Sequence, residues 1–128
     1  MLTGWLDTVA EADGYYLGGV VTPNETTLRN VLGIQEGLLD RHSAASGEMA
    51  AAMAAGCRER FKTDYALAVG RFPEFDPSAA EPKPVCVALA DSHGVKIDRF
   101  PFPSDPALLK IFCGKRALNM VRLVMVNR

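Results

Sequence analysis

A short buried strand is predicted by the run Tyr65-Ala66-Leu67-Ala68-Val69, which the chain leaves through Gly70-Arg71-Phe72-Pro73-Glu74-Phe75-Asp76-Pro77. In an open α/β domain, the loop after the carboxyl end of a strand is where ligands bind, usually through glycines that let backbone N–H groups approach an anion. This loop has one glycine, two prolines without N–H donors, and two carboxylates that repel phosphate. The scaffold resembles that of an enzyme, whereas the loop does not.

The second half of the chain predicts a hairpin followed by a long helix. Residues 85–90 and 95–102 are apolar enough for two strands, and the turn Asp91-Ser92-His93-Gly94 joins them. Asp105-Pro106 is a helix start, with a carboxylate cap and a proline at the first helical position, and leads into residues 107–126. We expect three arginines of this helix to form a solvated face: Arg116, Arg122 and Arg128.

The first half predicts helices around one central strand. Residues 2–9 have helical spacing and end at Asp13-Gly14, and the near-continuous apolar run 15–21 suits a buried strand. The next helix starts at Glu25, with Gly33 placed as its C-cap. Ser46 is a good N-cap for the helix at 47–62. The inward stripe of that helix is predicted to be Met49, Met53, Gly56, Cys57 and Arg60, and its small residues imply close packing on a sheet.

The resulting order, α-β-α-α-β-β-β-α, predicts a layered α/β sandwich with a mixed sheet. At 128 residues and 48% hydrophobic composition, the chain suits a single domain over residues 1–128.

Charge and apolar patterning exclude several partners. The net charge is -1 with both signs interspersed, so there is no basic stripe for a nucleic acid or an anionic membrane. No apolar run approaches the roughly 20 residues that cross a bilayer, and no signal peptide is evident, so we expect a cytoplasmic protein. The cysteines, Cys57, Cys86 and Cys113, have no C-x-x-C spacing and are predicted to be reduced core residues. We expect no metal and no cofactor.

Eight segments then occur in an order that resembles a known family. They are Tyr15-Tyr16-Leu17-Gly18-Gly19-Val20-Val21, Asn24-Glu25, Leu32-Gly33-Ile34, His42-Ser43-Ala44-Ala45-Ser46, Arg58-Glu59-Arg60-Phe61, Ala66-Leu67-Ala68-Val69, Glu81-Pro82-Lys83-Pro84-Val85 and Phe100-Pro101-Phe102-Pro103. The chain resembles the CinA C-terminal domain family, the nicotinamide-nucleotide amidohydrolases, over essentially its whole length. The resemblance implies an oligomeric three-layer α/β fold that, in active members, hydrolyses nicotinamide mononucleotide to nicotinic acid mononucleotide and ammonia.

The residues that carry the activity in that family do not transfer well to this chain. Active members have a Ser-Cys-Thr-Gly-Gly motif with a serine nucleophile, which would lie before Leu2 here, so we expect it to be missing. The family's Tyr-x-Asn-Glu-x-Lys supplies a lysine base. If Asn24-Glu25 is the anchor, Thr22 and Thr27 replace the tyrosine and the lysine; if the spacing from Gly33 is the anchor, Pro23 and Leu28 do. Either way no amine is present.

The family's glycine-rich Thr-Gly-Ile-Ala-Gly-Pro loop is replaced by the Gly70 to Phe75 segment. We therefore expect a CinA-like domain that has lost the amidohydrolase and acts through binding or oligomerisation. The alternatives are weak or altered hydrolysis, with Thr22 or Thr27 as candidate catalytic residues, and nucleotide sensing without turnover. The candidate ligand-binding residues are Asn24, Gly70 and Arg71. A homo-oligomer is expected, with Phe72 and Phe75 either as adhesive contacts or folded back onto the domain as a lid. The candidate ligand is a nicotinamide nucleotide or a related small molecule.

Other reactive side chains have simpler explanations. His93 suits an exposed turn, and His42, the second histidine, lies far from it in sequence. Cys86 in mid-strand and Cys113 on an apolar helix face do not look like activated nucleophiles. Solvation is favoured for the basic set Arg71, Lys83 and Lys110, and helix-end solvation for the acidic set Asp7, Glu11, Asp13 and Glu25.

Overall fold

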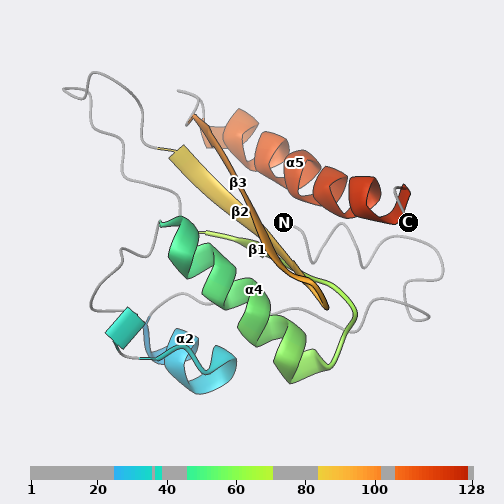
Figure 1. Cartoon of the computed structure of the whole chain (residues 1–128). Coiled ribbons are helices and arrows are strands. Elements are labelled where there is room, and N and C mark those ends of the chain that lie inside the picture. Colours follow the sequence, from blue (N-terminus) through green and yellow to red (C-terminus); the bar gives the residue numbers. More distant parts are fainter. Residues whose placement is uncertain (1–24, 36, 39–45, 71–83, 102–105, 127–128) are drawn as a thin grey trace.

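A computed structural model describes residues 25–35, 37–38, 46–70, 84–101 and 106–126. The elements run in the order α2 (Glu25–Leu32), α4 (Gly47–Phe61), β1 (Ala66–Val69), β2 (Pro84–Asp91), β3 (Gly94–Pro101) and α5 (Pro106–Val126). Figure 1 shows α4 and α2 on one side of the strands and α5 on the other. The described elements therefore form three layers, as predicted.

The described sheet has the order β1-β2-β3, and both strand pairs are antiparallel. Ala66 pairs with Ala90 across β1 and β2, and Val85 pairs with Phe100 across β2 and β3. The predicted hairpin is present, one residue earlier at both ends of β3. A mixed sheet would require the strand predicted at 15–21, which lies outside the described residues.

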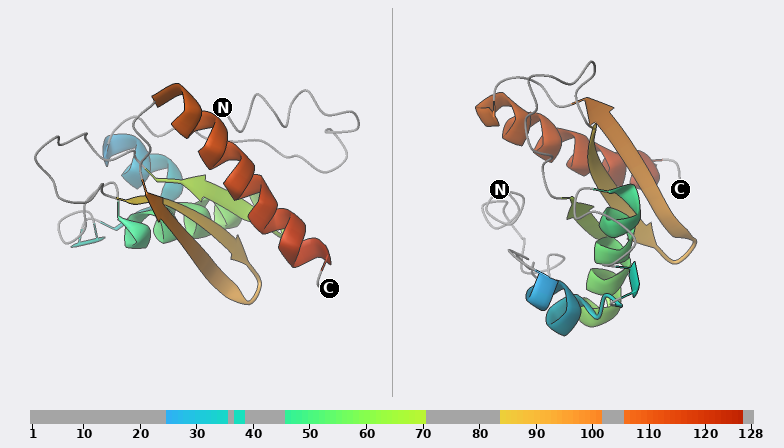
Figure 2. Two further views of the ribbon diagram at one scale, coloured as in Figure 1. Left: turned by 90° about the horizontal axis from the view of Figure 1, so that it is seen from above. Right: turned by 90° about the vertical axis from the view of Figure 1, so that its left-hand side faces the viewer.

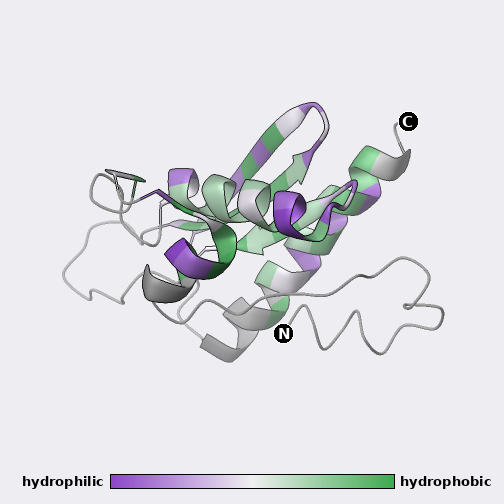
Figure 3. Cartoon of the chain, turned by 90° about the horizontal axis from the view of Figure 1, so that it is seen from below, coloured by the Kyte–Doolittle hydropathy of each residue, from purple (hydrophilic) through white to green (hydrophobic). Residues whose placement is uncertain are grey.

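Burial of β2 on both faces explains its unbroken apolar sequence. Six consecutive residues of this strand, from Val85 to Ala90, are buried. Because side chains alternate across a strand, even-numbered residues such as Cys86 face α4, and odd-numbered residues such as Val87 face α5. A strand that helices cover on both faces is apolar at every position, because neither face contacts water. By contrast, Figure 3 shows the tip of the hairpin alternating between hydrophilic and hydrophobic segments.

The face towards α4 is made of small side chains. Ala50 and Ala54 of α4 pack on Ala68, Ala88 and Ala90, with Cys86 in the same cluster. The sequence predicted that the inward stripe of α4 packs on the sheet, and this is only partly correct. Met49 and Cys57 pack with α2, in a cluster with Leu28, Leu32 and Ile34, while the alanines face the sheet.

The face towards α5 carries larger groups. Val85, Val87 and Phe100 pack on Cys113 and Ala117 of α5. The views in Figure 2 show α5 running along the hairpin from its base to its tip. Ile111 of α5 lies outside these contacts and is 46% exposed.

The prediction that Arg116 belongs to a solvated face is only partly correct, because its half-exposed side chain also binds β3. Its guanidinium donates to both carboxylate oxygens of Asp98 on β3, with Nε–Oδ2 at 2.7 Å and Nη2–Oδ1 at 3.2 Å. The same group lies 4.8 Å from the centre of the Phe100 ring. Arg116 therefore joins α5 to β3, whereas Arg122 is exposed and binds Asn119 on its own helix, and Arg128 lies outside the described residues.

The helix boundaries follow from local chemistry. Ser46 caps α4 by accepting a hydrogen bond from the Met49 N–H at 3.1 Å. α4 ends at Lys62, which takes a left-handed conformation (φ 53°) and donates its N–H to the Arg58 carbonyl. Gly33 has φ +69° directly after α2, as its predicted capping role requires. None of the helices in the described residues is long and apolar enough to cross a membrane.

Candidate functional site

The candidate site lies at the end of the sheet where β1 runs out. The backbone N–H of Gly70 donates to the Cys86 carbonyl at 2.8 Å, so this glycine extends the β1–β2 pairing by one residue. A Cβ at Gly70 would lie 3.1 Å from the Cys86 carbonyl oxygen and 3.7 Å from the Ala50 Cβ. Close packing of β1, β2 and α4 thus requires a small residue here, independently of any ligand.

An arginine from β3 reaches the same place. Arg99 is the register partner of Cys86. Its guanidinium lies directly against Gly47, the first residue of α4, where a Cβ would collide with it. The side chain of Arg99 is exposed, so a cation stands beside the amino end of α4. Both features attract anions, because the first turn of a helix carries a partial positive charge, while the carboxylate of Glu48 on the same turn opposes them.

The thiol at this site is not activated. Burial raises the pKa of Cys86 above its ordinary value, and this effect outweighs the neighbouring Arg99, which lowers it. Glu48, on the first turn of α4, adds to the rise. At neutral pH the group is a protonated thiol and a weak nucleophile. Burial also raises the pKa of Cys57, and raises that of Cys113 to about 11. Cys86 and Cys113 are buried core residues as predicted, whereas Cys57 is only half-buried.

α2 brings no amine to this site. The helix is Glu25-Thr26-Thr27-Leu28-Arg29-Asn30-Val31-Leu32, and its basic residue is Arg29 in the last turn. Leu28 is 5% exposed and shares a cluster with Met49 of α4. Thr27 lies in the first turn of α2. Whichever alignment places the family's lysine, at Thr27 or at Leu28, this chain has a hydroxyl or a buried aliphatic group there.

The other predicted site residues are placed as follows. His93 is exposed in the hairpin turn, at the opposite end of β2 from Cys86, and its backbone N–H donates to Asp91 Oδ1 at 2.8 Å. Lys110 lies in the first half of α5. The remaining predicted residues lie outside the described residues: Thr22, Asn24, His42, Arg71, Phe72, Phe75, Lys83, Asp7, Glu11 and Asp13. No cluster of three or more metal-ligating side chains occurs in the described part of the chain.

Sequence reasoning missed Arg99. It lies in a run predicted only as a strand, and its neighbour Gly47 follows the cap residue Ser46 by 1 position. The sequence alone offered two clues: an arginine in the predicted hairpin, and a glycine at the start of the predicted helix. Their pairing becomes meaningful only once the register Cys86–Arg99 is known.

These observations define a three-layer α/β domain in which an arginine of the sheet lies against the amino end of a helix. The chain matches the CinA C-terminal domain family over residues 1–125. It belongs to that family.

The chain is similar to proteins called CinA-like protein from several bacteria. It is 34% identical to the one from Solibacter usitatus over 125 residues, which cover 95% of this chain and 30% of that protein. It is 35% identical to the one from Geotalea uraniireducens over 114 residues, covering 87% of this chain and 27% of that protein. The chain thus spans under a third of the length of these curated relatives.

Solved structures agree on the fold. A competence-damaged protein (CinA) superfamily protein from Escherichia coli superposes with a TM-score of 0.85 at 23% identity, covering 96% of this chain and 73% of that one. The competence damage-inducible protein A from Klebsiella pneumoniae superposes with a TM-score of 0.83 at 26% identity, covering 94% and 76%. The predicted family and fold class are confirmed.

Proposed function

We propose that this chain is a CinA-family domain that does not hydrolyse nicotinamide mononucleotide and acts through binding or through self-association. The domain occupies residues 1–128 and works in the cytoplasm, without a metal, cofactor, nucleic acid or membrane. The observation that carries the proposal is the composition of α2, which holds no lysine. Arginine is not a general base in proteins, so the basic residue of α2 does not replace a lysine.

The residues beside Gly70 support the same conclusion. Its N–H, which a glycine-rich anion loop would point at a phosphate, is donated to the Cys86 carbonyl. The Cys86 thiol is held protonated by burial. Neither a backbone donor nor a thiolate from these two residues is available for amide hydrolysis. Loss of a base alone slows such chemistry by a factor of a thousand or more, roughly 4 kcal/mol of barrier.

Arg99 favours the binding role. It presents an exposed cation beside the amino end of α4, where the phosphate of a nicotinamide nucleotide would be attracted by both. Binding without turnover would make the domain a nucleotide sensor. Arg99 joins Asn24 and Arg71 in our candidate set of ligand-binding residues, whereas Gly70, whose N–H is donated to the Cys86 carbonyl, leaves it.

Self-association is the second proposed role, and exposed aliphatic side chains are the groups that it would cover. Val31 of α2, Val95 of β3, and Ile111 and Leu123 of α5 are each 38–46% exposed. Contiguous apolar patches mark surfaces that other chains cover, but α2 and α5 lie on opposite sides of the strands, so these four residues do not form one patch. Light scattering at increasing protein concentration tests this role; a monomer at every concentration contradicts it.

The test of the proposed function is thermal unfolding with and without millimolar nicotinamide mononucleotide, with ammonia assayed in the same tubes. A ligand that binds only the folded state adds about 2.7 kcal/mol at 100 times its dissociation constant, a shift of several degrees. If Arg99 holds the phosphate, Arg99→Ala abolishes the shift, and the control Lys115→Ala, at an exposed residue of α5, retains it.

Each outcome selects one role. A shift without ammonia supports binding without turnover. No shift and no ammonia supports self-association. Ammonia release that depends on the protein contradicts the proposal and shows that the domain is a hydrolase.

A further inference from the structure

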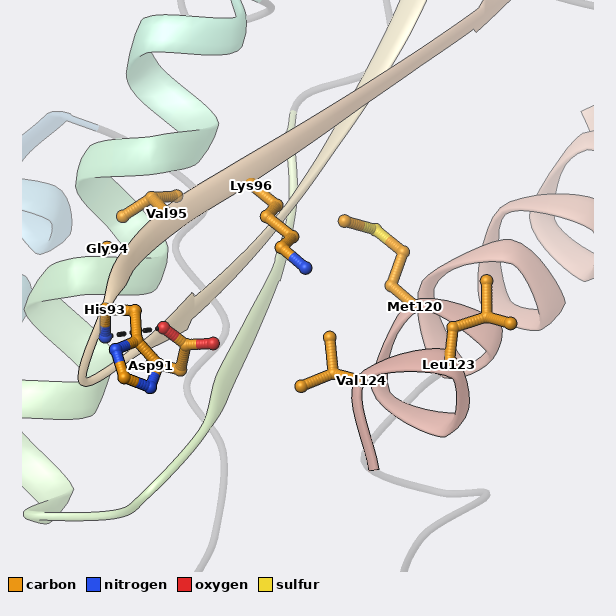
Figure 4. A pocket seen from close by; sticks show the side chains of 8 residues that line it. All are labelled: Asp91, His93, Gly94, Val95, Lys96, Met120, Leu123 and Val124. Atoms are coloured by element: carbon orange, nitrogen blue, oxygen red, sulfur yellow. Dashed lines mark hydrogen bonds between the residues drawn. The ribbon is translucent and has the colours of Figure 1, made fainter. Parts of the chain in front are cut away.

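A pocket of about 510 Å³ lies at the end of the sheet opposite the candidate site. One wall is the hairpin turn with its flanking residues, and the other is the carboxyl-terminal part of α5 (Figure 4). The two ends are five residues apart along β2, from Cys86 to Asp91, which is about 17 Å at 3.4 Å per residue. The pocket is therefore separate from the site discussed above.

The two walls of the pocket differ in chemistry. On the face of the hairpin that packs towards α5, the residues change from apolar near the base to charged near the tip. On β3, Phe100 is buried against α5, and Asp98 is paired with Arg116. The next residue on this face is Lys96, and on β2 the last one is Asp91. Opposite them α5 presents only apolar pocket residues, namely Met120, Leu123 and Val124. A charged wall therefore faces an apolar wall.

Lys96 has no ion-pair partner among the residues that the structure describes. Figure 4 shows its ammonium directed across the pocket towards Met120. Asp91 uses one oxygen, Oδ1, to accept the His93 N–H at 2.8 Å, and its carboxylate faces Val124. A cation and an anion thus enter the same pocket without pairing with each other.

We propose that this pocket binds a free α-amino acid with an apolar side chain, such as leucine, methionine or phenylalanine. The ligand's carboxylate binds the Lys96 ammonium, its ammonium binds the Asp91 carboxylate, and its side chain packs on Met120, Leu123 and Val124. Pockets of 300–1,000 Å³ with mostly apolar walls and a few polar groups are typical small-molecule sites. A purely anionic amphiphile would be repelled by Asp91, and a purely cationic one by Lys96.

The test is titration of the ¹⁵N-labelled protein with L-leucine, followed by amide chemical shifts. We expect saturable shifts at residues 91–96 and 120–124. Three matched compounds each remove one part of the ligand: 4-methylvalerate lacks the ammonium, isoamylamine lacks the carboxylate, and glycine lacks the side chain. Each should bind about tenfold more weakly or worse, since one charge-assisted or apolar contact is lost.

Matched variants assign the contacts. Asp91→Asn keeps an oxygen for the His93 N–H, so the turn is preserved while the charge is removed. Lys96→Met keeps the aliphatic stem. Both should weaken leucine binding about tenfold or more, whereas Lys115→Met, on the exposed part of α5, should leave it unchanged.

Three results overturn the proposal: no saturable shift with leucine, methionine or phenylalanine; equal binding of isoamylamine or 4-methylvalerate; or unchanged affinity in Lys96→Met. Because the spectra of the free variants report folding directly, a loss of binding through misfolding is recognised at once. The result is also independent of nicotinamide mononucleotide, which is absent from the titration.

Discussion

The two faces of the sheet are packed in opposite ways. Towards α4, the contact is alanine on alanine, with Ala50 and Ala54 against Ala68, Ala88 and Ala90. Towards α5, the contact is built from Val85, Val87 and Phe100, and an arginine-carboxylate pair lies at its border. Small side chains let a helix lie close on a sheet, whereas large ones hold it further away and interdigitate. Larger side chains on the α4 face should therefore destabilise the domain, and so should smaller side chains on the α5 face.

The largest effect is expected from Phe100→Ala. Phe100 is 3% exposed, packs between β2 and α5, and supports the Arg116 guanidinium. Removing the ring leaves a cavity and should lower the free energy of unfolding by about 3–5 kcal/mol. Urea titration measures this, with Ile111→Ala on the exposed side of α5 as the control. Similar losses for both variants would show that the α5 face is not tightly packed.

Next in size is Ala54→Leu, the reverse change on the other face. Ala54 is fully buried between α4 and the sheet, so the added methyl and methylene groups must displace the helix. We expect a loss of about 3 kcal/mol, at the upper end for overpacking. Ala55→Leu, one position along and exposed, should change stability by about 0.5 kcal/mol or less. Equal urea midpoints for the two variants would contradict close packing on the α4 face.

A pH dependence should separate the thiols of the two faces. Burial raises the pKa of Cys113 from 9.0 to about 11, while Arg99 partly offsets the same effect at Cys86. Between pH 9 and 11 the unfolded Cys113 loses its proton and the folded one keeps it, so the free energy of unfolding falls as pH rises. Below pH 9 this residue contributes no slope.

Thermal unfolding from pH 8 to 11 measures that fall. Cys113→Ala should flatten it more than Cys86→Ala does, even though both variants start from lower stability. The opposite ranking would show that Cys113, rather than Cys86, is the thiol with an offsetting charge.

The smallest effect is expected at the border of the α5 face. The side chains of Arg116 and Asp98 are 41% and 30% exposed, so solvent screens much of their attraction. A double-mutant cycle with Arg116→Met and Asp98→Asn should give a coupling energy of about 1 kcal/mol or less. Coupling should fall further in high salt. A value several times larger would mean that the pair, rather than the apolar contacts, holds α5 in place.

Local signals explain what the sequence could predict. Ser46 before α4, Gly33 after α2 and the turn from Asp91 to Gly94 each act through neighbours a few residues away. The family resemblance supplied the three-layer arrangement.

Long-range pairings explain what the sequence could not predict. Arg116 meets Asp98 across 18 positions, and Arg99 meets Gly47 across 52. The orientation of α4 also depended on tertiary contacts, because Met49 and Ala50 are adjacent and either could have faced the sheet. The contact between Arg99 and Gly47 can be predicted only when the register of β3 and the position of α4 are both known.

We propose that this CinA-family domain keeps the family's fold and does not hydrolyse nicotinamide mononucleotide. The most direct measurement is ammonia release from nicotinamide mononucleotide during prolonged incubation, beside a family member that has both the Ser-Cys-Thr-Gly-Gly motif and the lysine. We predict release equal to the protein-free blank while the active relative converts the substrate fully. Ammonia that rises in proportion to the concentration of this protein, with matching nicotinic acid mononucleotide, would contradict the claim.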